Sequence, residues 1–474
     1  MQMNERARAN AQRGETFRLS GAYDEAIEIF KQLLEKAPND AWVNAHLGAT
    51  YCQLMDYGKA EECLKKAIGK SKNYFWAHAQ LGETYRLWAL AENRRKKYID
   101  SAIEHFQKAL DGKEPADSTY EWALAHLGAT YRLNITSGII QLLNELVTPA
   151  LSQGKLSGLD VIQQNKDTAL QYLNRALELM PTYAWAWGMR STVYRLAQEY
   201  KDSFCDLEVE TVVAPNFEIL QNSSFPVPFL ESSRVNLYEH AFLFFYLTKQ
   251  TEDPHEKQKC YLRAIAFLQQ ALILRPGDLI AKLILTIVDT KQKQEKQDGQ
   301  ALTPDEIEKL QRKLDRFFED LEEDFWQICK KVLRNQMNVP EPSVTIEKLQ
   351  SIYNQAEEGH KLKKLILEDV INNQKSGVRE NSQLWLWKNV AQIQMCTYVL
   401  FLLSELSHIL GKDSNIGTAR PYRELALTIA PYVFIERLYQ TPVFSDADRK
   451  SIVKELNDGI GFNLKETALP KWGD

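Results

Sequence analysis

Apolar residues recur at intervals of three and four along most of the chain, and this spacing places side chains on one face of an α-helix. The stretch from Leu310 to Val332 keeps the spacing, and Thr303 before Pro304 and two acids is typical of a helix start. We predict one long amphipathic helix from Thr303. Further helices are expected at about 343–374, 382–410, 418–438 and 445–457. We therefore predict an all-α protein.

A heptad occurs three times in the first third of the chain. It reads AHLGATY at Ala45–Tyr51 and Ala125–Tyr131, and AQLGETY at Ala79–Tyr85. Its glycine recurs every 34 residues at the start of the chain, and an aromatic residue follows each glycine three positions later. These paired positions are Gly14 and Phe17, Gly48 and Tyr51, and Gly82 and Tyr85.

A second set of positions repeats with the glycines. A small residue and then a bulky apolar one follow at Ala26 and Phe30 in the first unit, and at Ala60 and Leu64 in the second. A small residue lets one helix approach its neighbour closely, and Pro38 ends the first unit. The period therefore predicts pairs of packed helices.

This spacing resembles that of the tetratricopeptide repeat family, whose period is also 34 residues. The resemblance implies a solenoid of stacked helical hairpins with a continuous core and a concave groove. We expect the solenoid at about 4–290, with insertions at about 90–98 and 134–166. A polar linker at 291–302 and a C-terminal helical domain at 303–474 are expected to follow.

The family resemblance also implies which side chains line the groove. With the glycine numbered eighth in its repeat, groove position 2 is tryptophan in four of five units and position 12 is arginine in four of five. Position 6 carries two histidines. The predicted partner-binding residues are Arg132, Arg195, Arg86, Arg18, Trp42, Trp76, Trp122, Trp185, His46 and His126.

Two interpretations of this set are open. The arginines select an acidic or phosphorylated segment and the tryptophans anchor it, or the tryptophans pack between repeats and the arginines are solvated or paired. An acid three residues earlier can pair with Arg18 and with Arg86. Arg132 and Arg195 have no such acid, and we expect them to contact the ligand.

The insertion at 134–166 contains an apolar stretch, Gly138–Val147, that ends before Pro149. It predicts a short helix, followed by a polar loop. This helix is expected either to fold over the mouth of the groove, to meet a partner, or to pack on the outer face of its own repeats.

The composition indicates the number of domains, the kinds of binding partner and the cellular compartment to expect. A chain of 474 residues is expected to form two or three domains. The net charge of −5 does not favour nucleic acid or anionic membrane, and the apolar runs Ala241–Leu247 and Cys396–Leu403 are too short to span a bilayer. Six scattered cysteines and the lack of an apolar N-terminal segment lead us to expect a cytoplasmic protein without a zinc site.

The sequence lacks the usual signatures of catalysis, including phosphate-binding, dinucleotide-binding, serine-hydrolase and zinc-protease patterns. Cys329 with His360, or Cys396 with His408, could form a nucleophile and base, but buried thiols are mostly inert. We predict no enzyme, no cofactor and no metal.

The expected function is a protein-interaction scaffold that binds a peptide or helix of a partner protein, with the C-terminal domain positioning or regulating it. Two alternatives remain open. One is binding of a polyanion or nucleic acid along the groove arginines, aided by Arg94–Lys97. The other is a C-terminal effector activity that the repeats regulate.

Overall fold

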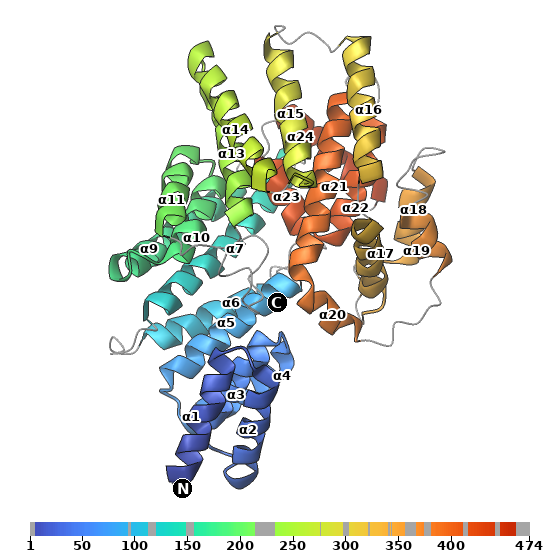
Figure 1. Ribbon diagram of the computed structural model, residues 1–474. Helices are drawn as coiled ribbons and strands as arrows, with labels where there is room; N and C mark the ends of the chain where they lie inside the picture. The colour runs from blue at the N-terminus through green and yellow to red at the C-terminus, as the bar shows by residue number, and fades with distance from the viewer. Residues whose placement is uncertain are drawn as a thin grey trace. The chain divides into compact units, whose positions relative to one another are not determined.

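A computed structural model gives the fold, and all the regular structure that it describes is α-helical (Figure 1). The described residues are 5–92, 96–111, 120–147, 156–213, 233–274, 276–296, 303–320, 323–339, 342, 344–355, 366–373, 381–410, 416–440 and 446–460. Within these ranges there is no strand, as the sequence predicts.

The helices of the first half are α1 (Glu5–Leu19), α2 (Tyr23–Lys36), α3 (Ala41–Gln53), α4 (Tyr57–Lys70), α5 (Phe75–Ala91), α6 (Lys96–Leu110), α7 (Tyr120–Val147), α9 (Ser157–Leu179), α10 (Ala184–Leu196) and α11 (Tyr200–Val213). Those of the second half are α13 (Ser233–Gln250), α14 (Pro254–Leu274), α15 (Leu279–Lys296), α16 (Pro304–Asp320), α17 (Glu323–Met337), α18 (Ile346–Gln355), α19 (Glu368–Asn372), α20 (Ser382–Lys388), α21 (Val390–Leu410), α22 (Ile416–Ile429), α23 (Pro431–Gln440) and α24 (Asp446–Ile460).

The chain divides into two compact units. Unit 1 comprises Met1–Ile135, Gln163–Val193 and Val213–Pro226, and unit 2 comprises Thr136–Ile162, Tyr194–Val212 and Val227–Asp474. The division passes through α7, α9 and α10, whereas the sequence suggests a boundary at 291–302. Part of that expected linker is helical, because α15 continues to Lys296 and buries Gln292 and Gln294.

Unit 1 is a series of helical hairpins, in which α1 packs on α2, α3 on α4 and α5 on α6. A Cβ atom added at Gly14 would lie 2.7 Å from the ring of Phe30, and one added at Gly48 would lie 2.7 Å from Leu64. The two helices of a hairpin therefore touch at the glycine, and a larger residue would force them apart.

The same contact recurs beyond the two insertions. A Cβ atom at Gly82 would lie 2.9 Å from Phe106, and one at Gly128 would lie 2.7 Å from Leu173. The predicted repeat register is therefore confirmed in the third and fourth units. The surplus residues lengthen the hairpins without changing how the helices meet.

The sequence predicts a separate short helix at 138–147 in the insertion, and the structure describes a different arrangement for these residues. Residues 138–147 instead continue α7, which is 28 residues long, and α9 is lengthened at its start. The prediction is wrong because the apolar residues keep helical spacing directly after the repeat. Within unit 2 the two extensions cross closely, and a Cβ atom at Gly158 would lie 2.7 Å from the carbonyl oxygen of Gly138.

The long helix predicted from Thr303 corresponds to α16 and α17, and the two residues between them, 321–322, lie outside the described ranges. Its predicted start is confirmed: the Glu306 amide lies 3.4 Å from the Thr303 hydroxyl, and the Thr303 amide donates to the Glu306 carboxylate at 2.9 Å. Each of the next three predicted helices corresponds to a pair of helices; the last two are divided at Asn389 and Ala430, and the residues between the first pair, 356–365, lie outside the described ranges. The observed pairs are α18 and α19, α20 and α21, and α22 and α23.

Helix α21 lies in the core of unit 2, where it packs against α15, α16, α17, α22 and α23. No single helix within the described ranges is long and apolar enough to cross a membrane. The segments Ser382–Lys388 and Gln392–Ile409 meet that test only when taken together, and a bend of 78° separates them.

Candidate functional site

A cluster of polar and aromatic side chains joins the first three repeats. Glu15 and Arg18 on α1 form an ion pair with a shortest distance of 2.6 Å, and His46 on α3 contacts the same carboxylate through Nδ1 at 2.7 Å. The His46 ring is stacked between two indoles, with centroids 3.7 Å from Trp42 and 4.3 Å from Trp76. These five residues are called the first cluster.

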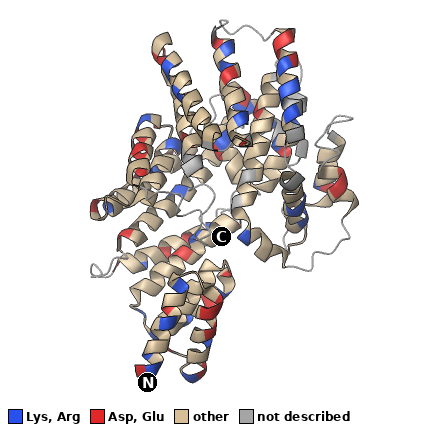
Figure 2. Ribbon diagram, viewed as in Figure 1, with Lys and Arg blue, Asp and Glu red and all other residues tan. Residues whose placement is uncertain are grey.

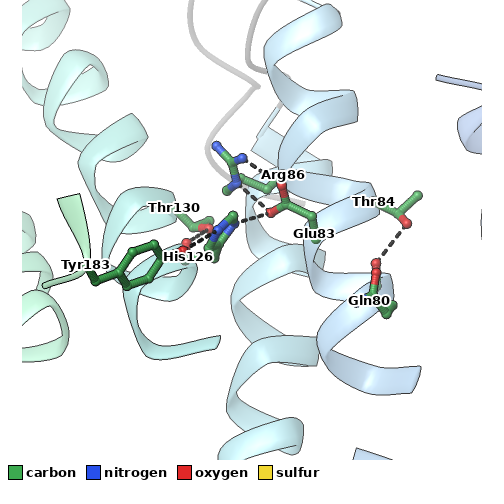
Figure 3. A network of polar contacts seen from close by, with 7 residues as sticks. All are labelled: Gln80, Glu83, Thr84, Arg86, His126, Thr130 and Tyr183. Atoms are coloured by element: carbon green, nitrogen blue, oxygen red, sulfur yellow. Dashed lines mark hydrogen bonds and ion pairs between the residues drawn. The ribbon is translucent and has the colours of Figure 1, made fainter. Parts of the chain in front are cut away.

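The second cluster repeats this arrangement one pair of repeats later (Figure 3). Glu83 and Arg86 on α5 pair at 2.7 Å, and His126 on α7 contacts Glu83 through Nδ1 at 2.7 Å. The His126 ring lies between two indoles: that of Trp185 is stacked on it with centroids 4.2 Å apart, and that of Trp122 is tilted by 31° with centroids 4.3 Å apart. The two clusters therefore agree in residue type and closely in geometry.

The duplicated element is thus a pair of repeats. Glutamate and histidine come from alternate units, since repeat position 6 reads Gln12, His46, Gln80, His126. Position 9 is glutamate in the first and third units and alanine in the second and fourth. This alternation is visible in the sequence and could have identified Glu15 and Glu83, which are missing from the predicted set.

Hydrogen bonding defines the protonation of the second cluster. His126 donates from Nδ1 to Glu83, and its Nε2 can then accept from the Tyr183 hydroxyl at 3.4 Å. Burial lowers the pKa of His126. Burial alone would raise the pKa of Glu83, but Arg86 and His126 outweigh this and hold it at about 2. In this cluster a neutral histidine therefore donates a hydrogen bond to the Glu83 carboxylate, and Arg86 balances the charge of that carboxylate.

The stability of these clusters is expected to depend on pH. A histidine with a lowered pKa in the folded state favours folding above its unfolded pKa of about 6.5, and this contribution decreases as the pH falls. The ionised glutamates stabilise the folded state above a pH of about 4.5, and this stabilisation is lost as the pH falls to about 2. The urea midpoint of unfolding should fall between pH 7 and pH 5. The double variant His46→Gln/His126→Gln should show a smaller fall, and an equal fall would contradict this assignment.

The family comparison identifies the hairpins. The model of the tetratricopeptide repeat matches this chain over residues 17–85. Residues 17–85 are tetratricopeptide repeats. Such repeats in general present extended surfaces on which they bind partner proteins. A comparison with curated protein sequences gives no match.

Solved structures to which this chain is similar include tetratricopeptide repeat proteins. PilF from Pseudomonas aeruginosa is 14% identical, with a TM-score of 0.39 over 60% of this chain and 97% of PilF. A thermophilic repeat protein from Thermus thermophilus is 20% identical, with a TM-score of 0.33 over 45% of this chain and 95% of its own. YrrB, described as having an unusual peptide-binding site, is 16% identical, with a TM-score of 0.32 over 53% of this chain and 95% of its own. Similarities at this level carry no information on what the present chain binds.

The four arginines predicted to line the tetratricopeptide groove have different surroundings. Arg18 and Arg86 belong to the two clusters, and Arg132 is half-buried on α7. Arg195 has no acid three residues earlier, as the sequence shows, but an acid from elsewhere in the chain pairs with it. In unit 2 its guanidinium pairs with Glu239, which comes from a helix 44 residues away in the sequence. Sequence spacing within one repeat could not reveal this acid.

Glu239 joins two arginines in the core of unit 2. Its other carboxylate oxygen accepts from Arg437 of α23 at 2.7 Å, and all three charged residues are buried. The Arg437 guanidinium also lies 4.5 Å from the ring centroid of Tyr398 and 5.6 Å from that of Phe242. The buried triad Arg195–Glu239–Arg437 therefore ties α10, α13 and α23 together.

The described residues include both members of only one of the two cysteine–histidine pairs, Cys396 with His408. His360 lies outside the described residues. Cys396 and His408 are 12 residues apart on the same helix, or about 18 Å along its axis. Cys329 is buried, which raises the pKa of its thiol, and it contacts Cys396. Among the described residues, no group of three or more His, Cys, Asp or Glu side chains could hold a metal ion.

Proposed function

We propose that the chain is a protein-interaction scaffold that binds a partner segment on the face formed by the first helices of its repeats. The observation that carries this proposal is the pair of duplicated clusters. Each cluster holds two half-buried tryptophans in fixed positions against a buried histidine. Rigid aromatic side chains with part of their surface exposed make effective anchors, because little conformational entropy is lost on binding.

The charges of the clusters determine which kind of partner segment this face would bind. Arg18 and Arg86 already balance Glu15 and Glu83, and Arg195 belongs to the buried triad. We assign the preference for an acidic partner to Arg132, which holds groove position 12 of its repeat and is partly exposed on α7. We assign to the C-terminal helices the role of holding the last repeat helices in place. The triad supports that role, since α23 contributes Arg437 to it.

Affinity capture from an extract of the source cells tests the proposal. We expect Arg132→Gln to lose a protein partner that the wild type retains. Arg175→Gln is the matched control, because Arg175 lies on α9 with 49% of its side chain exposed and pairs with its helix neighbour Glu178. Thermal unfolding midpoints would show that both variants fold. A partner that Arg132→Gln binds as well as the control does would refute the role of Arg132.

Binding of a polyanion is the second candidate, and the charge distribution does not favour it. Acidic and basic residues are both distributed over the helices (Figure 2). Of the segment Arg94–Lys97, only Lys96 and Lys97 lie within the described residues. Nucleic acid in the captured material, lost steeply as salt is added, would support this candidate over the first.

A further inference from the structure

Two histidines face one another inside the third repeat, apart from the clusters described above. His78 lies on α5 and His105 on α6, and their Nδ1 atoms are 3.0 Å apart. Their rings are stacked, with centroids 5.2 Å apart and planes at 25°. His78 is buried and His105 is half-buried, so the pair is reached from the side of α6.

The backbone fixes which nitrogen of His78 carries its proton. Nε2 of His78 lies 3.2 Å from the carbonyl oxygen of Lys72. A carbonyl oxygen only accepts hydrogen bonds, so Nε2 of His78 must be the protonated donor. In the neutral ring the lone pair then sits on Nδ1, which faces His105. His105 donates its own Nδ1 proton to this lone pair.

The contact to Lys72 recurs at the same position of two other repeats. In the second repeat the equivalent residue Asn44 donates to the carbonyl of Pro38, and in the fifth Trp187 donates to that of Pro181. In each case the acceptor lies six residues earlier in the chain. The hairpin therefore needs only Nε2 of His78, and Nδ1 serves no purpose shared with the other repeats.

We propose that His78 and His105 form a binding site for a divalent transition-metal ion that prefers imidazole ligands, with Zn²⁺ as the representative ion. Zinc lies about 2.0–2.1 Å from imidazole nitrogens, so two nitrogens 3.0 Å apart subtend about 90–100° at the metal. The two Nδ1 atoms now point at one another, so both rings must rotate to turn their lone pairs toward a shared ion, and this rotation also widens the angle toward the tetrahedral value. Water would supply the remaining ligands.

Two further features suit the pair to this role. A carbonyl that accepts from the second ring nitrogen is the usual way in which proteins orient a histidine ligand, and Lys72 supplies it. Burial lowers the pKa of His78 and lowers that of His105 to about 4, so both rings are neutral near pH 7. Metal binding then moves the His105 proton from Nδ1 to Nε2 and releases none to solvent.

Titration calorimetry of the full chain with ZnCl₂ tests the proposal. The wild type should bind one more Zn²⁺ than His105→Gln or His78→Asn does. The asparagine variant preserves the fold, because Asn44 makes the same backbone contact in the second repeat. His255→Gln is the control, since His255 is exposed on α14, and it should bind Zn²⁺ as the wild type does.

Repeating the titration in two buffers of different ionisation enthalpy identifies the ligands. A site that uses a thiol, such as the exposed Cys205, releases protons on binding, and its measured enthalpy depends on the buffer. The histidine pair should show no such dependence. The proposal is overturned if both histidine variants bind Zn²⁺ as the wild type does, if the wild type binds none, or if the enthalpy of the site changes with the buffer.

Discussion

Replacing Glu239 with alanine is expected to lower the free energy of unfolding by about 3–5 kcal/mol, because it leaves two buried arginines without their shared acid. Arg195, Glu239 and Arg437 each expose less than a tenth of their surface. Removing one member of a buried ion group costs far more than the group contributes in net terms, since the remaining charges stay desolvated. The measurement is urea unfolding followed by tryptophan fluorescence.

A matched control separates this effect from the general effect of removing a carboxylate. Glu178 pairs with Arg175 on the surface of α9, where more than half of its side chain is exposed, so Glu178→Ala should change stability by about 0–1 kcal/mol. The loss of stability in Glu239→Gln should lie between those of Glu239→Ala and Glu178→Ala, because glutamine keeps an acceptor oxygen but loses the charge. A Glu239→Ala protein as stable as the Glu178→Ala protein would show that the triad is absent in solution.

Gly158→Ala is expected to destabilise unit 2 by about 1–3 kcal/mol, which is the usual cost of overpacking. The added Cβ would lie 2.7 Å from the Gly138 carbonyl oxygen and 2.7 Å from the Leu142 Cα atom. Both are backbone atoms of α7 and cannot rotate away, so the two helices must separate.

Gly69→Ala provides the control with the opposite sign. Gly69 lies in α4, and a Cβ atom there would meet nothing within 4 Å. Alanine favours the helix over glycine by up to about 1 kcal/mol, so this variant should be as stable as the wild type or more so. Both variants can be compared through their urea midpoints. A Gly158→Ala midpoint equal to that of Gly69→Ala would contradict the close crossing of α7 and α9.

The repeat register was predictable because the contact that fixes it is local. Gly48 and Leu64 lie on the two helices of one hairpin, and their spacing recurs wherever the same contact is made. Even the long insertion did not hide it, since Leu173 still follows a small residue and packs on Gly128. Steric contacts within one hairpin therefore produce a regular pattern of small and bulky residues in the sequence.

The environment of Arg195 was not predictable, because its acid comes from outside the repeat. Glu239 follows a stretch that departs from the repeat register, and Arg437 is a further 198 residues along the chain. The division between α22 and α23 at Ala430 was also missed, since apolar residues keep helical spacing on both sides of it. Periodicity shows which face of a helix is apolar and does not show where one helix stops and the next begins.

The alternation of the two clusters limits how this array can gain or lose length. A glutamate-bearing repeat must be followed by a histidine-bearing one, because each carboxylate is satisfied by the next unit along. Excising the second repeat alone would bring Glu15 against the repeat that carries Glu83, with no histidine between them. The unit that can be inserted, deleted or exchanged without breaking one of these contacts is therefore two consecutive hairpins. The number of repeats in this segment can change only by two at a time.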